Sequence, residues 1–327
     1  MELSTTVSEL RYALDTFFFL MSGALVMWMA AGFAMLEAGL VRSKNTTEIL
    51  TKNLCLYAIA CTTYLVVGYN IMYVDNTAGG IMPSIGALIG TQSEGADHSL
   101  ESDFFFQVVF VATAMSVVSG AVAERMKLWS FLVFSAILTA FIYPMEGSWT
   151  WGGESVFGLF SLSELTENVM VDGEMTYYAF TDFAGSGIVH LAGAAAALAG
   201  VLLLGARKGK YGANGQVNAI PGANLPMATL GTFILWLGWF GFNGGSVLAL
   251  ASVESANAVA VVFMNTNAAA AGGLIGALLL ARILFKKADL TMALNGALAG
   301  LVAITAGPDT PTALSATLIG FVGGLIV

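Results

Sequence analysis

Charged side chains are scarce in this chain: Asp, Glu, Lys and Arg together make up 10% of its 327 residues. Ordinary globular domains carry about 25% of such residues. Proline is scarce too, with six residues, and the chain has only two histidines and two cysteines. So few charges cannot cover a large water-exposed surface, which argues against a soluble fold.

Enzyme signatures are also missing from the sequence. It contains neither HExxH nor GxSxG, and it lacks a P-loop and a glycine-rich dinucleotide fingerprint. Cys55 and Cys61 match no zinc or redox spacing, so we interpret them as reduced packing residues. A net charge of −9 does not indicate nucleic-acid binding. We therefore expect no enzyme activity, no metal or other cofactor, and no nucleic-acid partner.

Long apolar runs dominate what is present. Hydrophobic residues make up 57% of the chain, and its mean hydropathy is +0.81. A helix needs about 20 apolar residues to cross a bilayer. The sequence predicts an all-α polytopic membrane protein with nine spans, near residues 17–41, 53–74, 104–123, 128–145, 180–204, 225–249, 258–281, 291–307 and 312–327.

Basic residues predict the orientation, because cytoplasmic loops carry an excess of Lys and Arg. All twelve Lys and Arg except Arg11 follow odd-numbered spans: Arg42, Lys44, Lys52, Arg125, Lys127, Arg207, Lys208, Lys210, Arg282, Lys286 and Lys287. Acids gather in the opposite connections: Asp75, Glu94, Asp97, Glu101, Asp103, Glu146, Glu154, Glu164, Glu167, Asp172, Glu174, Glu254 and Asp309. We predict a plasma-membrane protein with its N-terminus outside and residue 327 on the cytoplasmic side. The acidic outer face either concentrates cations or keeps exposed loops soluble.

The run DFAGSGIVHLAGAAAALAG, residues 182–200, places His190 inside an apolar span. Ionisable side chains in lipid are costly and usually functional, so His190 is a candidate site residue. The alternative is a neutral core histidine bonded to a neighbouring helix. Asp182 lies near the start of the span, where it can cap free N–H groups, and roughly on the same side of the helix as His190. His98 is interpreted as a solvated loop residue.

Few other polar residues lie in or at the spans: Glu37, Gln107, Asn243, Ser246, Asn265, Thr266 and Asn267. Aromatic residues gather at the predicted outer ends: Phe104, Phe105, Phe106, Phe110, Trp149, Trp151, Trp239, Phe240 and Phe242. They are either an interfacial belt or a cation site, since each ring face attracts a small cation by ~0.5–2 kcal/mol when partly desolvated. Paired small residues predict close helix packing: Gly241 with Gly245, Gly272 with Gly276, Gly296 with Gly300, and Gly320 with Gly324.

Six motifs taken together resemble the ammonium transporters of the Amt/Mep/Rh family, over about residues 14–327. They are GFAMLEAGLVRSKN at 32–45, FFQVVFVATAMSVVSGAVAER at 105–125, WGG at 151–153, DFAGSGIVH at 182–190, GWFGFNGGS at 238–246 and NTNAAAAGG at 265–273. The resemblance implies an Amt-type bundle of eleven helices in an inverted five-plus-five repeat, of which about nine are present. It implies one transmembrane domain at 1–327, with 1–210 as the first repeat half and 225–327 as an incomplete second half.

The resemblance also implies an outer recruitment site. Phe110, Trp151 and Ser246 would take up ammonium there, and Asp182 would be the family's outer aspartate. A hydroxyl acceptor and aromatic faces can replace part of the hydration of a cation with four N–H donors.

Below that site the resemblance implies a pore. Phe110 and Phe242 would form a stacked aromatic gate above His190, the first of the family's two pore histidines. Supporting residues are expected beside them: Phe106, Gln107 and Asn243. The sequence departs from the family pattern in two respects. No histidine follows His190, since the chain stops within the ninth span, and Ser148 stands where many members have a histidine, just before the WGG motif. We expect either part of a longer polypeptide lacking the last two helices here, or a protein that binds ammonium without conducting it.

The leading functional prediction is an ammonium transporter, moving ammonium, or ammonia plus a proton, across the plasma membrane. Methylammonium is the implied analogue, and potassium, which donates no hydrogen bond, is expected to be excluded. Implied partners are the lipid bilayer, two further copies in a homotrimer, and a cytoplasmic regulatory signalling protein. The alternative is an ammonium sensor domain of a longer signalling protein; a third reading is a structural or regulatory subunit.

Overall fold

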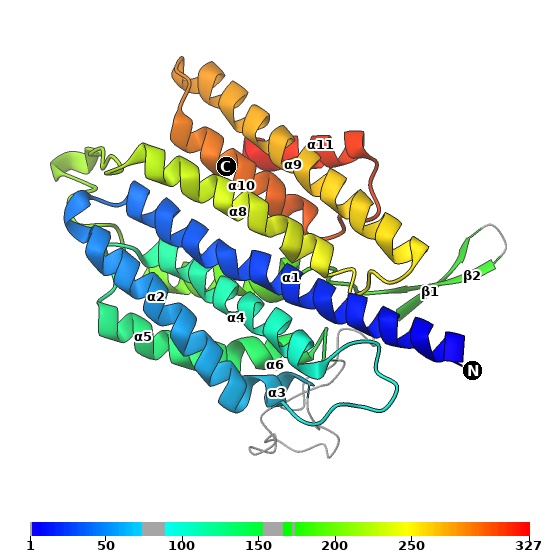
Figure 1. Cartoon of the computed structure of the whole chain (residues 1–327). Coiled ribbons are helices and arrows are strands. Elements are labelled where there is room, and N and C mark those ends of the chain that lie inside the picture. Colours follow the sequence, from blue (N-terminus) through cyan, green and yellow to red (C-terminus); the bar gives the residue numbers. More distant parts are fainter. Residues whose placement is uncertain (1, 74–88, 153–165, 172–173) are drawn as a thin grey trace.

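Long helices laid side by side make up most of this computed structural model (Figure 1). The structure describes residues 2–73, 89–152, 166–171 and 174–327. Five residues of the sequence predictions lie outside this part: Asp75, Gly153, Glu154, Glu164 and Asp172.

Each predicted span corresponds to a helical segment. The first five are α1 (Glu2–Leu40), α2–η2–α3 (Thr46–Thr63, Tyr64–Gly68, Tyr69–Tyr73), α4 (Leu100–Val122), α5–η3–α6 (Leu128–Ile137, Leu138–Ile142, Tyr143–Ser148) and η6–α7 (Ser186–Leu191, Ala192–Leu204). The last four are α8 (Leu225–Gly245), α9 (Val253–Phe285), α10 (Leu290–Ile304) and α11 (Ala313–Ile326). In the described residues seven segments are long and apolar enough to cross a membrane, and α10 and α11 are shorter apolar helices. A multi-pass helical membrane protein is therefore confirmed.

Several boundaries differ from the prediction. Helix α1 begins at Glu2, because its polar first turns continue the helix beyond the apolar run. The fifth span begins at Ser186 rather than near residue 180, since the residues before it form a turn. The connection between the fourth and fifth predicted spans contains a hairpin that was not predicted: β1 (Thr166–Val171) pairs antiparallel with β2 (Glu174–Ala179). Figure 1 shows it projecting beyond the helix ends.

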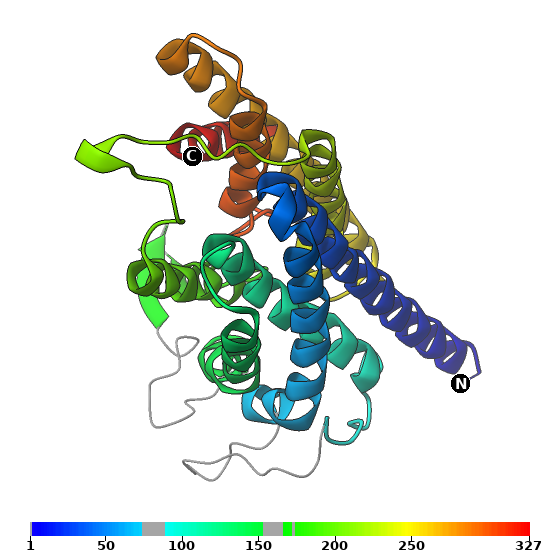
Figure 2. The same cartoon turned by 90° about the vertical axis from the view of Figure 1, so that its left-hand side faces the viewer.

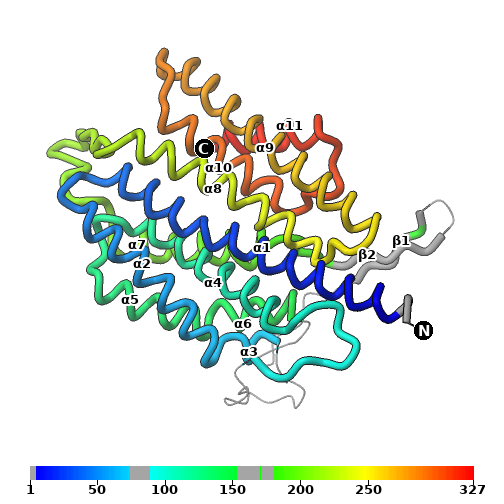
Figure 3. The backbone as a smooth tube through the Cα atoms, in the orientation of Figure 1, coloured from blue at the N-terminus to red at the C-terminus, as the bar shows by residue number. Residues whose placement is uncertain are grey.

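Helices α1 and α8 run along each other through the middle of the bundle (Figures 2 and 3). On one side α4 packs against α1, with α2, α5 and α7 around it; on the other α9 packs against α8, with α10 and α11. Glycines allow the α1–α8 contact: a Cβ atom at Gly39 would lie 2.5 Å from the Asn224 carbonyl oxygen, and one at Gly241 equally close to that of Ser22. Only a residue without a side chain fits such a contact.

Three of the four predicted small-residue pairs lie at contacts among α9, α10 and α11. Gly272 and Gly276 face the α11 backbone, Gly296 and Gly300 face α9, and Gly320 and Gly324 also face α9. The predicted close packing of these helices is confirmed.

Most of the basic residues collect at one end of the bundle, as predicted, and we call it the basic end. It comprises the connections at 41–45, 123–127, 205–224 and 286–289; the opposite end, with the 89–99, hairpin and 246–252 segments, is the acidic end. Lys52 is an exception: it is 5% exposed inside α2, so its interpretation as a loop cation was wrong.

Glu124 ties three connections together at the basic end. Its Oε1 accepts hydrogen bonds from the Arg42 backbone N–H at 3.0 Å, from Arg42 Nε at 2.9 Å and from Asn45 Nδ2, and Arg207 Nη1 donates to Oε2 at 3.2 Å. Burial of the carboxylate opposes its ionisation, but these hydrogen bonds and the Arg42 charge prevail and lower its pKa to about 2.

We predict that Glu124→Gln destabilises the protein at pH 7, by roughly 1–3 kcal/mol, because charge-assisted hydrogen bonds to two arginines are lost. The pKa of Glu124 is lowered on folding, so this stability is present above its ordinary value of 4.5 and is lost as the pH falls through about 2. Melting temperatures in detergent at pH 7 and across pH 4.5 to 2 check this, with exposed Glu9→Gln as the control. A difference in melting temperature between the wild type and Glu124→Gln that stays constant down to pH 2 would contradict this prediction.

Candidate functional site

A series of aromatic rings in contact with one another runs through the core near the acidic end. The Phe110 ring on α4 lies 5.9 Å from Trp151 and 4.2 Å from Phe242 on α8, between centroids. Phe242 in turn lies 5.3 Å from His190, and His190 lies 5.2 Å from Trp239. The predicted gate pair and the predicted pore histidine are thus brought into one continuous series from three separate helices.

His190 faces this series from the π-helical segment η6. It is 8% exposed, and its Nε2 has no hydrogen-bond partner in the described part of the chain. Its ring lies within 17° of parallel to Phe242 and 25° to Trp239. The alternative of a histidine bonded through Nε2 to a neighbouring helix is not what the geometry shows. π-Helical turns occur frequently at functional sites.

Asp182 binds the free N–H groups at the start of η6. Its Oδ1 accepts from the backbone N–H groups of Gly185 and Ser186 at 3.0 and 2.7 Å, and its Oδ2 from those of Gly187 and Ile188, both at 2.9 Å. The predicted capping role is confirmed. Gly185 makes this turn with a φ of 94°, which a residue with a side chain rarely adopts.

The same turn positions Trp151. The Asp182 carbonyl oxygen accepts a hydrogen bond from Trp151 Nε1 at 2.7 Å. A Cβ atom at Gly185 would lie 3.2 Å from the Trp151 ring, so the turn also fixes how closely the indole approaches. Asp182 therefore acts on the ring series through its backbone, while both carboxylate oxygens stay engaged with η6.

A cavity of about 210 Å³ opens above the rings at the acidic end. Its lining includes Trp151 and Ser246, which were predicted for the outer site, and Phe106 and Gln107, which were predicted as supporting residues. Ser246 Oγ donates to the Phe242 carbonyl at 2.8 Å, which leaves its lone pairs as acceptors. Gln107 Oε1 is buried with no partner among the described residues. Asn243 lies deeper, fully buried, with Nδ2 donating to Thr266 Oγ1 at 3.0 Å.

Among the lining residues that the sequence analysis did not assign to this site are an acid and a histidine. Asp103 lines it, with Oδ2 accepting from Tyr69 O–H at 2.6 Å. His98 lines it too, and its ring stacks on Phe19 with centroids 4.2 Å apart, so the interpretation as a solvated loop residue was wrong. The loop at 89–99 folds back over α1, which no local pattern in the sequence signals.

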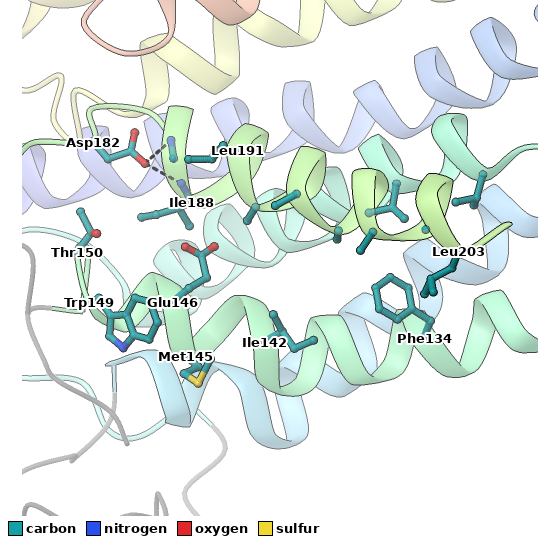
Figure 4. A pocket seen from close by; sticks show the side chains of 18 of the residues that line it. Phe134, Ile142, Met145, Glu146, Trp149, Thr150, Asp182, Ile188, Leu191 and Leu203 are labelled. Carbon is teal, nitrogen blue, oxygen red and sulfur yellow. Dashed lines mark hydrogen bonds between the residues drawn. The ribbon is translucent and has the colours of Figure 1, made fainter. Parts of the chain in front are cut away.

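A second, apolar cavity of about 740 Å³ lies between α5–η3–α6 and η6–α7, as Figure 4 shows from close by. Glu146 points into it from α6, across from Ile188, and Asp182 stands at the same end. Asp182 therefore lines this apolar cavity and does not line the cavity above the rings. Within the described residues, no three His, Cys, Asp or Glu side chains gather as a metal site.

A multi-span helical membrane protein with a buried ring-lined core is the class that this fold and site define. The profile of the Ammonium Transporter Family matches residues 17–327, and the chain belongs to that family. It is a family of transporters rather than enzymes.

Individual relatives agree with this assignment. The chain is 44% identical to ammonium transporter Amt2 of Archaeoglobus fulgidus over 307 residues, which are 94% of this chain and 62% of that protein. Its structure resembles a sensor Amt protein with a TM-score of 0.84 and 34% identity, over 97% of this chain and 74% of the other. It also resembles Mep2 of Candida albicans, with a TM-score of 0.80 and 26% identity, over 98% of this chain and 66% of that one. The chain thus spans less than two thirds of the length of the Archaeoglobus relative.

We predict that Asp182→Asn destabilises the protein by about 2–4 kcal/mol, because an amide offers one acceptor oxygen and leaves two N–H groups of η6 unpaired. Thermal unfolding monitored by tryptophan fluorescence checks this, since the Trp151 environment depends on the same turn. Asp309→Asn, at an exposed position, is the matched control. Equal melting temperatures for the two variants contradict the role of Asp182.

Proposed function

We propose that this chain forms the conduction part of an ammonium transporter. The observation that carries the proposal is the ring series Trp151–Phe110–Phe242–His190, which begins at the cavity containing Ser246. Membership in the Ammonium Transporter Family supports ammonium as the cargo.

The chemistry of the acidic-end cavity suits a small N–H-bearing cation. The Trp151 ring face attracts a positive charge, and Gln107 Oε1 and Ser246 Oγ are acceptors for its N–H groups. Asp103 adds an acidic group to the lining. Four N–H donors of ammonium would thus exchange water for fixed acceptors, whereas potassium offers no donor to them.

The rings beneath the cavity favour passage of a neutral molecule. Phe110 and Phe242 are 1% and 0% exposed, so a cation passing between them would lose its hydration with no charged partner in return. Ammonia, neutral and small, escapes most of that cost. Beyond the rings, the unpartnered Nε2 of His190 is a hydrogen-bond acceptor in its neutral form or a proton carrier.

Orientation and assembly belong to the same proposal. The acidic end faces outward and the basic end faces the cytoplasm of a plasma membrane, because Lys and Arg accumulate on the cytoplasmic side. The first half, 1–210, and the part at 225–327 form one domain, and three copies make a homotrimer with one pore each. A cytoplasmic signalling protein would regulate it at the basic end.

A sensor function is the second candidate. The likeness to a sensor Amt protein, at a TM-score of 0.84, favours keeping it. In that case the cavity binds ammonium and the chain passes the signal on without sustained flux.

Current across a supported membrane after an ammonium jump distinguishes the two candidates, using the chain reconstituted in liposomes. We expect a sustained ammonium current that is absent after a potassium jump and reduced in His190→Ala. A brief transient without steady flux would instead favour the sensor. His98→Ala is unsuitable as a control, because His98 lines the cavity.

We predict that Trp151→Leu raises the concentration of ammonium or methylammonium that gives half-maximal current about tenfold. The reason is that the variant loses a cation–π contact and the indole that forms one wall of the cavity. The same jump experiment, run over a concentration series, measures this. Trp129→Leu is the matched control, because Trp129 is 79% exposed on α5. A Trp151→Leu protein whose oligomer dissociates, with unchanged affinity in what remains, would show that Trp151 serves packing only.

A further inference from the structure

We propose that Glu37 forms a second cation site, at the basic end, where the cargo is held as ammonium before it leaves the protein. The inference rests on the proposed function and adds to it an inner acceptor. It begins from a cavity of about 950 Å³ at the basic end, whose lining includes Glu37.

This inner cavity lies on the same helices as the ring series. Gly120 of α4 and Leu225 of α8 line it, while Phe110 of α4 and Phe242 of α8 carry the rings. Ten residues of α4 separate Phe110 from Gly120, about 15 Å along the helix. The two cavities thus stand at opposite ends of one pair of helices, with the rings between them.

Glu37 is held at the wall of the inner cavity by one of its two oxygens. Its Oε2 accepts a hydrogen bond from Ser119 Oγ at 2.7 Å and lies 3.5 Å from Lys52 Nζ. Lys52 also donates to the Ser119 carbonyl at 2.8 Å and lies 4.9 Å from the centre of the Phe131 ring. A Cβ atom at Gly120 would meet the Glu37 carboxyl carbon at 4.0 Å, so the side chain lies against α4.

The other oxygen of Glu37 is free. Oε1 is buried and accepts no hydrogen bond from the residues that the structure describes, and the residue as a whole is 6% exposed. The neighbouring Asn53 amide donates to the Ile49 carbonyl at 3.0 Å; it also lies near the Glu37 carboxyl but does not meet the geometry of a hydrogen bond to Oε1. An ionised oxygen left unpaired in this setting is costly, so a donor from the cavity would be bound favourably.

Lys52 shows which chemistry this carboxylate accepts. Its ammonium head sits between the Glu37 carboxylate and an aromatic face, which is the combination of an anion and a ring that suits a free ammonium ion. Free ammonium at Oε1 would make the matching contact from the cavity side, donating one N–H to Oε1 and others to water. Glu37 would then share its charge between a resident cation and the cargo.

Infrared difference spectra of the chain in lipid vesicles, exchanged between ammonium and potassium buffers at pH 7, test the site directly. We expect an ammonium-dependent carboxylate band that is absent in Glu37→Gln. It should persist in Glu254→Gln, an exposed acid at the other end, and in Trp151→Leu at saturating ammonium.

A second variant gives an effect of opposite sign. Lys52→Met removes the competing cation, so half-saturation of the Glu37 band should occur at an ammonium concentration about tenfold lower. A purely structural ion pair would predict the reverse, a weakened protein with no gain in binding. The double variant Glu37→Gln/Lys52→Met leaves no unpaired charge, so it serves as the band-free reference if Glu37→Gln alone fails to fold.

The outcomes separate this inference from the proposed function. A sustained ammonium current without a Glu37 band, or a band that persists in both Glu37 variants, overturns the inner site and leaves transport standing. A Glu37 band without current supports the inner site and rejects sustained transport. Equal ammonium and potassium spectra in the wild type at saturation also overturn the inner site.

Discussion

The candidate site depends on the hydrogen bonds between the Asp182 carboxylate and the backbone N–H groups at the start of η6. A membrane interior offers no water to the free N–H groups of a helix start, so they need acceptors from the protein. Asp182 supplies two oxygens to four of them, and its carbonyl oxygen holds the Trp151 indole. With η6 begun at that depth, His190 meets the faces of Phe242 and Trp239. A residue outside the ring series therefore determines how the series is assembled.

Helices α4 and α8 then organise the rest. Each carries a polar cavity wall near one end, rings in between, and a second cavity wall at its other end. The two ends differ chemically: the acidic-end cavity combines rings with neutral acceptors and Asp103, while the inner one is lined by Glu37, Arg125, Arg207 and Asp289. In the described part of the chain, charged groups thus line the two cavities at the ends of this helix pair, and the ring series with the His190 imidazole lies between them.

Long-period features of the sequence predicted the fold well, because lipid imposes length and hydropathy on every span. The motifs that carry the family resemblance also predicted Phe110, Phe242 and His190 as site residues. The structure brings the rings of these three residues together. Lys52 and His98 were misjudged, since each was interpreted from its neighbours in sequence. Their surroundings come from elsewhere in the chain: Glu37 and Ser119 for Lys52, and Phe19 for His98. Local sequence patterns do not predict contacts with residues that are distant in the sequence.

The π-helical turns carry a consequence for how this chain tolerates insertions and deletions. Among the residues that the structure describes, three spans contain one: η2 (Tyr64–Gly68), η3 (Leu138–Ile142) and η6 (Ser186–Leu191). Each accommodates an extra residue that an α-helix, at about 3.6 residues per turn, would not. Deleting one residue within η6 would restore α-helical winding and leave the flanking parts of the span in register, whereas the same deletion in a regular α-helix would rotate one part against the other by about 100°. Homologues that lack one residue in these segments would thus keep the same helix faces turned to the rings on either side of the turn.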